Sequence, residues 1–330
     1  MTEIIAFIQN GIKLSTVILY GAVGEILTEK SGNLNLGVPG IMYLGGIVSL
    51  IGVFFYEKST PDPIPIVCVL IALSCAFLAS VLGGLIYSVL TISLRANQNV
   101  TGLTLTIFAG GFANFFGGSL MKLAGGVGQI NVATTSAAFR ATLPFVQELP
   151  ALPRMLLGFG FMVYLAVVVA FLVSWFLNRS SVGLNLRAVG ENPATADAAG
   201  INVTKYKYLA TCIGAGISGM GGLYYVMDFT MGIWDSAGGI ESLGWLAVAL
   251  VIFSSWKPKR AIWGSYLFGM LIRLSSYTQD TLNLTRRSME LFKMLPYLVT
   301  VIVLVVVSLR RSRENQPPAA LGLPYFREER

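Results

Sequence analysis

Long apolar runs alternate with short polar links along almost the whole chain, and this pattern predicts membrane-spanning helices. A helix needs about 20 apolar residues to cross the hydrocarbon core of a bilayer. We therefore expect about nine spans, and the pattern is compatible with eight to ten. The predicted spans cover approximately residues 14–27, 36–56, 64–94, 103–121, 155–177, 206–227, 241–255, 261–277 and 293–309. The predicted fold is an all-α polytopic membrane domain, residues 1–309, followed by a basic cytoplasmic tail, residues 310–330.

Two polar interruptions, near residues 32–40 and 95–102, are rich in Gly and Asn, which break helices. Backbone that leaves the helix at membrane depth has to be buried in protein or line a cavity. We expect broken helix segments beside a solute pathway; plain cytoplasmic turns capped by Asn and Ser explain the same residues equally well. The candidate pathway residues are Asn33, Asn35, Asn97, Gln98, Asn99, Thr101 and Asn114.

A polar island at residues 178–205 separates two apolar runs, and residues 190–201 within it carry the signals of a short helix. Asn192 suits the N-cap, Pro193 the first helical position and Gly200 the stop. A helix this short between two spans buries no core of its own. We interpret it as a surface element that another protein grips, and an ordinary solvated loop is the alternative.

Charge is sparse and unevenly distributed. The chain is 55% hydrophobic and 12% charged, against about 25% charged for a soluble domain. The net charge of +7 therefore indicates orientation rather than nucleic-acid binding, because Lys and Arg collect on cytoplasmic loops. Of the 23 Lys and Arg, 14 fall on the side of the island and eight on the other, with Arg273 inside a span. This predicts an external N-terminus and a cytoplasmic C-terminus. Arg286 and Arg287 oppose the rule, so we expect residues 278–292 to form a surface or re-entrant piece.

The chain lacks the residues that most catalysis needs. It has no histidine, no lysine preceded by glycine as in phosphate-binding loops, and three cysteines that all lie in apolar runs. We expect no enzyme activity, no metal and no bound cofactor. We expect the span interiors to hold almost no charge apart from Arg273, which suits a pathway for a neutral solute. Glycines between 214 and 222 predict close packing of the sixth span against its neighbours.

Four stretches resemble the permease subunits of bacterial ABC importers, in the branch that serves branched-chain amino acids, ribose and nucleosides. They are Gly24–Gly40, Arg95–Gly102, Leu186–Val203 and Met294–Thr300. Leu186–Val203 looks like the family's coupling helix and is the most specific. The first and last stretches together resemble the nucleoside subgroup, whose importers use a lipoprotein receptor. Pro39 is a departure, since that pattern has Glu before the Gly.

The resemblance implies a heteromeric importer in the bacterial cytoplasmic membrane. A separate cytoplasmic ATPase binds ATP-Mg and grips the coupling helix, a second homologous permease chain completes the pathway, and an extracytoplasmic binding lipoprotein delivers the solute. Glu191 and Asp197 would pair with basic groups of the ATPase, while Ala194, Ala196, Ala198 and Ala199 offer a slim surface. The coupling residues are Gly190, Glu191, Asn192, Pro193, Asp197, Ala198 and Gly200.

Nucleosides are the expected substrates, ahead of ribose or another simple sugar, with branched-chain amino acids third. An uncoupled channel or a secondary carrier is the competing class, and a requirement for ATP and a separate ATPase discriminates between them.

Overall fold

The structure is a computed structural model of the full chain. It describes residues 2–123, 130–142, 146, 150, 153, 157–282, 291, 294–295, 297–299, 301–302, 305 and 316–326. Within these residues the chain is helical, and its only β pairing is an isolated bridge between Asn131 and Ile233. The all-α prediction is therefore confirmed for the described part of the chain.

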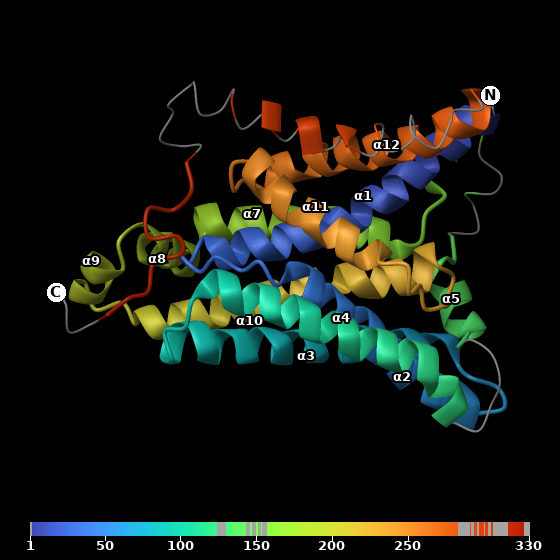
Figure 1. Cartoon of the computed structure of the whole chain (residues 1–330), viewed down its shortest axis with the longest axis horizontal. Helices are drawn as coiled ribbons and strands as arrows, with labels where there is room; N and C mark the ends of the chain where they lie inside the picture. Colours follow the sequence, from blue (N-terminus) through green and yellow to red (C-terminus); the bar gives the residue numbers. More distant parts are fainter. Residues whose placement is uncertain are drawn as a thin grey trace.

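The long helices lie side by side (Figure 1). They are α1 (Thr2–Glu29), α2 (Val38–Ser59), α3 (Pro65–Ser88), α4 (Gln98–Leu123), α7 (Phe161–Arg179), α10 (Val203–Tyr224), α11 (Gly239–Phe253) and α12 (Pro258–Leu282). Two single π-helical turns, η1 (Val89–Ser93) and η3 (Tyr225–Phe229), extend α3 and α10. The short helices are α5 (Ala133–Phe139), α8 (Ser181–Glu191) and α9 (Pro193–Ala198).

Six described helices are long and apolar enough to cross a membrane: those in Ile4–Glu29, Val38–Ser59, Pro65–Ser93, Gln98–Leu120, Phe161–Arg179 and Val203–Phe229. Helices α11 and α12 occupy the positions of the predicted seventh and eighth spans. The predicted ninth span, 293–309, and the segment 278–292 lie mostly outside the described residues. The protein is thus a multi-pass membrane protein, and the count of nine stays a prediction.

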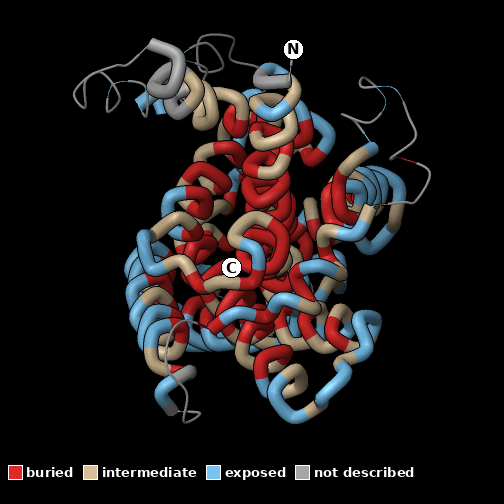
Figure 2. Tube along the Cα trace, turned by 90° about the vertical axis from the view of Figure 1, so that its right-hand side faces the viewer, coloured by how far each residue is buried: buried red, intermediate tan, exposed pale blue. Residues whose placement is uncertain are grey.

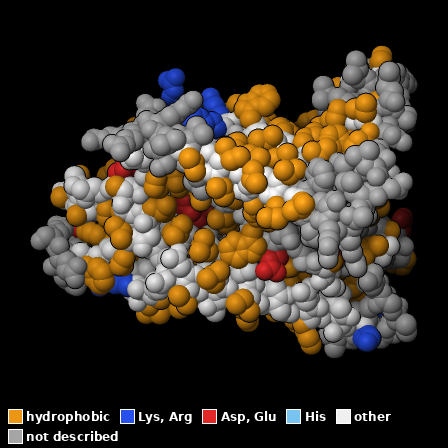
Figure 3. Space-filling model, turned by 45° about the horizontal axis from the view of Figure 1, so that its top comes forward, with side chains coloured by type: hydrophobic (Ala, Val, Ile, Leu, Met, Phe, Trp, Pro, Cys, Tyr) orange, Lys and Arg blue, Asp and Glu red, His pale blue; other side chains and the backbone are white. Residues whose placement is uncertain are grey.

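Helices α1, α2 and α10 form the centre of the bundle. Helix α1 packs against α10, α12, α11 and α7, and α10 packs against α3 and α2. Seen end on, the buried positions gather in the middle and the exposed ones lie outside (Figure 2). The exposed outer positions are themselves apolar, including Ile107, Trp175 and Trp263, and orange side chains spread across one face in Figure 3. This surface suits contact with lipid or another apolar partner.

Glycines explain how α10 comes so close to α1 and α2, as the sequence predicted. A Cβ placed on Gly24 would overlap the backbone oxygen of Gly214, and a Cβ on Gly222 would overlap the backbone oxygen of Met42. Only glycine allows the helices to approach this closely, so the glycine-rich sixth span is confirmed as a packing surface.

The Gly222→Ala variant should lose about 1–3 kcal/mol of stability, because the added methyl group meets backbone that cannot move aside. The measurement is thermal or denaturant unfolding of the protein in detergent. Gly118→Ala on α4 is the matched control, because nothing lies within 4 Å of a Cβ there. Equal stability of the two variants would contradict the proposed packing.

Candidate functional site

The short helix predicted at residues 190–201 is present as α9. Asn192 lies at its N-cap, where Oδ1 accepts a hydrogen bond from Thr195 N at 3.0 Å, and Pro193 takes the first helical position. Gly200 ends it with a φ of +83°, a left-handed conformation that favours glycine. Gly190 and Glu191, however, belong to a separate helix, α8, which the sequence did not predict. We refer to residues 190–201 as the coupling segment.

One side of the coupling segment packs against neighbouring helices through buried apolar side chains. Val189, Ala196 and Val203 form a small buried cluster beneath α9. Ala196 therefore faces inward, and its predicted place on the outer surface is wrong, whereas Ala198 and Ala199 are exposed. A Cβ on Gly190 would overlap the backbone oxygen of Lys30, so the end of α8 rests directly on the loop that follows α1. The coupling segment and that loop are thus in direct backbone contact.

Residues 316–326, near the C-terminus, pack across the coupling segment. We call residues 316–326 the C-terminal strap. Ala320 N donates to Gly190 O at 3.0 Å, and Gly322 N donates to Gly32 O at 3.1 Å. Tyr325 Oη donates to Asp197 Oδ2 at 2.8 Å. The strap therefore holds the coupling segment and the loop after α1 together.

Both carboxylates expected to meet the ATPase already have contacts within the chain. Asp197 accepts the bond from Tyr325, and Glu191 Oε2 accepts a hydrogen bond from Ala319 N at 3.3 Å. An ATPase that pairs with these carboxylates would have to share them with the strap or displace it.

The two predicted helix interruptions are present and touch each other. Residues 30–37 and 94–97 are non-helical. Leu34 N donates to Gln98 Oε1 at 2.7 Å, and the Tyr87 hydroxyl donates to Leu34 O. A Cβ on Gly102 would lie 2.9 Å from Gly37 N, so the interruptions pack backbone to backbone. Leu34 and Gln98 are 64 residues apart in sequence, yet the two segments are in direct contact. We call this contact, between residues 30–37 and residues 94–102, the joint; it lies close to the coupling segment.

Three of the seven candidate pathway residues lie within this joint. Asn33 and Asn35 are buried with Gln98. Asn33 Nδ2 donates to Thr211 Oγ1 at 3.1 Å, and Asn35 Oδ1 accepts from Gly37 N at 2.8 Å. These hydrogen bonds stabilise the conformation of the loop, so each of the three side chains has a structural role.

The other four candidates separate into two places; Asn97, Asn99 and Asn114 are exposed, and Thr101 is partly exposed. Asn97, Asn99 and Thr101 lie at the start of α4, where Asn97 Oδ1 caps the helix by accepting from Val100 N at 3.1 Å. Asn114 lies four turns further along α4 and accepts a hydrogen bond from Trp234 Nε1 at 3.1 Å. Their contact with a solute stays a prediction.

The expectation that Arg273 is the exception in otherwise uncharged spans is wrong. Glu25 and Glu29 are 1% and 2% exposed on α1. Glu25 Oε1 accepts from Asn35 N at 3.1 Å, and Trp256 Nε1 donates to Glu29 Oε2. Glu25 thus binds the loop after α1, and Glu29 binds the turn between α11 and α12. The backbone N–H and the indole N–H offset the free-energy cost of burying the two carboxylates.

Helix α10 and η3 also carry buried charge. Lys207 is 3% exposed near the start of α10, and Asp228 in η3 forms an ion pair with Lys13 at 3.3 Å. Sequence reasoning missed the ion pair because Lys13 and Asp228 lie on helices far apart in the sequence, and it missed the burial of Lys207 because burial depends on the packing of the bundle. An acidic residue inside an apolar run, such as Glu25, is the signal that was available.

Comparison with known proteins identifies the family. Residues 7–304 match the family model of the permease component of branched-chain amino acid transport systems. The chain is 32% identical to a putative glucose ABC transporter permease of Haloferax volcanii, over 96% of both chains. It is 27% identical to the guanosine ABC transporter permease of Bacillus subtilis, over 94% of this chain and 92% of that one. It is 28% identical to a nucleoside ABC transporter permease of Lactococcus lactis, over 91% of both.

No solved structure matches the chain. The resemblance of the four stretches is nevertheless confirmed, because the match extends through all of them. The chain belongs to the permease family of the branched-chain amino acid transport system type and is an ABC transporter permease.

Proposed function

We propose that this chain is the membrane subunit of an ATP-driven importer that moves nucleosides into the cell. The observation that carries the substrate class is the similarity, over nine-tenths of the chain, to permeases named for guanosine and for nucleosides. The relative named for glucose supports a simple sugar as the second candidate.

The importer has further subunits. A cytoplasmic ATPase binds ATP-Mg and docks on the coupling segment, because Ala198 and Ala199 offer an exposed surface of small side chains there. A second permease chain covers exposed apolar surface such as that of α3 and α4, and an extracytoplasmic lipoprotein delivers the solute. Membrane lipid covers the remaining apolar outer surface.

The N-terminus is external and the described C-terminal strap is cytoplasmic. Two observations support this orientation in the cytoplasmic membrane. Helices α8 and α9 and the described end of the chain lie at one end of the bundle, opposite the N-terminus (Figure 1). Lys257, Lys259 and Arg260 line a cavity with Lys30 and Arg187 at that same end, as the excess of positive charge on cytoplasmic loops requires.

Competition in an uptake assay tests the substrate class. Cells with and without the gene are given labelled guanosine or adenosine, and ribose, glucose, nucleobases and leucine are added as competitors. We expect gene-dependent uptake that only nucleosides inhibit. Inhibition by ribose or glucose would support the sugar candidate, and inhibition by leucine would contradict both.

The exposed polar residues at the start of α4 are proposed to contact the solute. We expect Asn99→Ala to raise the KM of uptake about three- to tenfold, the cost of one lost hydrogen bond. Uptake kinetics measure this, with copurification of the partner subunits as the control for assembly. Asn97→Ala is a less clean test because Asn97 also caps α4. Unchanged uptake after alanine replacement of each of Asn97, Gln98, Asn99 and Thr101 would contradict solute contact.

A further inference from the structure

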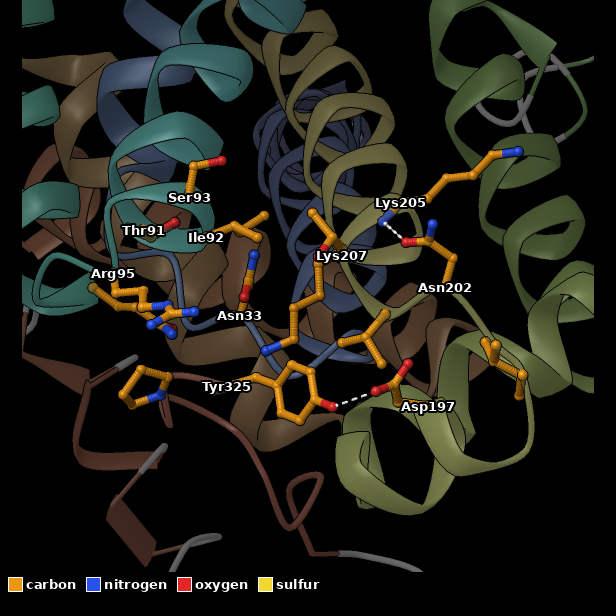
Figure 4. Close-up of a pocket in the computed structure, with 16 residues that line it drawn as sticks. Asn33, Thr91, Ile92, Ser93, Arg95, Asp197, Asn202, Lys205, Lys207 and Tyr325 are labelled. Atoms are coloured by element: carbon orange, nitrogen blue, oxygen red, sulfur yellow. Dashed lines mark hydrogen bonds between the residues drawn. The ribbon is translucent and has the colours of Figure 1, made fainter. Parts of the chain in front are cut away.

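A cavity of about 780 Å³ lies beneath the C-terminal strap, between the joint and the start of α10. Its volume is within the range of small-molecule binding sites. Asn33, Arg95, Asp197, Lys207 and Tyr325 contribute to its walls. They come from five separate elements of the chain, and Figure 4 shows Arg95, Asn33 and Lys207 around the same space.

Lys207 is the unusual member of this set. Its side chain is 3% exposed and runs from α10 toward Tyr325 (Figure 4). Among the described residues, no ion pair or hydrogen bond reaches its ammonium group. Most of the side chain is buried, while the residue also lines the cavity, so its positive charge is partly removed from bulk water at the cavity wall. An anion that binds in the cavity would compensate this charge.

Arg95 supplies a second cation. It lies in the non-helical link between η1 and α4 with a φ of 57°, a conformation that is unfavourable for a residue with a side chain. Its guanidinium lies 4.4 Å from the ring centroid of Phe326 in the strap. Arg95 and Lys207 therefore approach the cavity from different elements, and the carboxylate of Asp197 is bonded to Tyr325.

Asn33 adds an acceptor. Its side chain is 1% exposed, and its Oδ1 has no hydrogen-bond partner among the described residues, while Nδ2 is bonded to Thr211. A ligand that satisfies the cavity thus combines negative charge with a hydroxyl or N–H donor. Phosphate groups match Arg and Lys through several acceptor oxygens.

We propose that this cavity binds a phosphate group that carries a nearby hydroxyl or N–H donor. A soluble sugar or nucleoside phosphate and a phosphatidylglycerol headgroup share this chemistry. Because Tyr325 of the strap, Asp197 of the coupling segment and Asn33 of the joint all line the cavity, an occupant would contact all three parts. Binding then stiffens the path by which movement of the coupling segment reaches the spans. The cytoplasmic location rests on the orientation proposed above, but the binding itself does not.

Thermal unfolding and calorimetry of the full-length protein, purified with its partner subunits, test the proposal. The probes are inorganic phosphate and adenosine 5′-monophosphate, added to protein in phosphatidylcholine nanodiscs. We expect the nucleotide to raise the Tm and the Lys207→Met variant to weaken its binding at least about tenfold, as loss of a charge-assisted hydrogen bond predicts. Lys207→Met should also unfold at the same or a higher temperature without ligand, so a folding defect would not imitate the result.

Lys259→Met is the matched control. Lys259 is a lysine at the same end of the bundle, but its side chain is exposed and lines a different cavity. We expect its affinity for the nucleotide to remain within about threefold of the original, which is under 1 kcal/mol.

The two sources of phosphate are separated by the lipid. A Tm increase with the nucleotide in phosphatidylcholine supports a soluble ligand, whereas an increase in phosphatidylglycerol nanodiscs alone, again lost in Lys207→Met, supports a headgroup. No Lys207-dependent stabilisation by either would overturn the proposal.

Discussion

The Ala198→Trp variant should lose ATP-driven uptake while it still folds and reaches the membrane. Ala198 is the last residue of α9 and is exposed, so an indole there meets no part of the described chain that it must displace. It does enlarge the slim surface on which we propose that the ATPase docks. We expect uptake to fall by at least about tenfold, corresponding to a docking penalty of 1.4 kcal/mol or more.

Initial uptake rate, membrane abundance and copurification of the ATPase measure this effect together. Ala198→Ser is the matched control, because it changes the same position without adding bulk and should keep near-normal uptake. Normal uptake by Ala198→Trp would contradict docking at α9. A loss of membrane abundance would instead indicate that Ala198 is needed for folding.

The Trp256→Ala variant should lose about 3–5 kcal/mol of stability. Trp256 is 7% exposed, and its Nε1 donates to Glu29, whose side chain is buried on α1. Truncation leaves both a cavity and a buried carboxylate without its indole donor. Unfolding of the protein in detergent, followed by heat or denaturant, gives the free-energy difference.

Trp263→Ala is the matched control, because it removes the same type of side chain from an exposed position. Trp263 is 78% exposed on α12, seven positions further along, so its loss should change stability in detergent by less than about 0.5 kcal/mol. Equal stability losses in the two variants would contradict the claim that Trp256 stabilises the fold through its contact with the buried side chain of Glu29.

Local signals made α9 and the two helix interruptions predictable from sequence. Asn192, Pro193 and Gly200 define the helix through capping and backbone preferences that act over a few residues. The glycines of α10 are equally informative, since no other residue tolerates such close backbone contact. The length of the apolar runs was enough to indicate a bundle of membrane-spanning helices.

Features that depend on distant contacts were not predictable. Glu29 and Trp256 are 227 positions apart, and no local pattern indicates that they meet. The C-terminal strap packs through backbone hydrogen bonds to Gly190 and Gly32, and such bonds carry no side-chain signature in the sequence. The same reason explains why the seven candidate pathway residues are divided between the joint, the start of α4 and a position near Trp234.

The most direct test of the central claim is whether nucleoside uptake through this chain is driven by ATP. Labelled guanosine is given to cells with and without the gene, first with normal energy supply and then with ATP depleted while the ion gradient is maintained. An importer coupled through α9 to an ATPase predicts gene-dependent uptake that disappears when ATP is depleted. Gene-dependent uptake that persists without ATP would contradict the account and would indicate a channel or a secondary carrier.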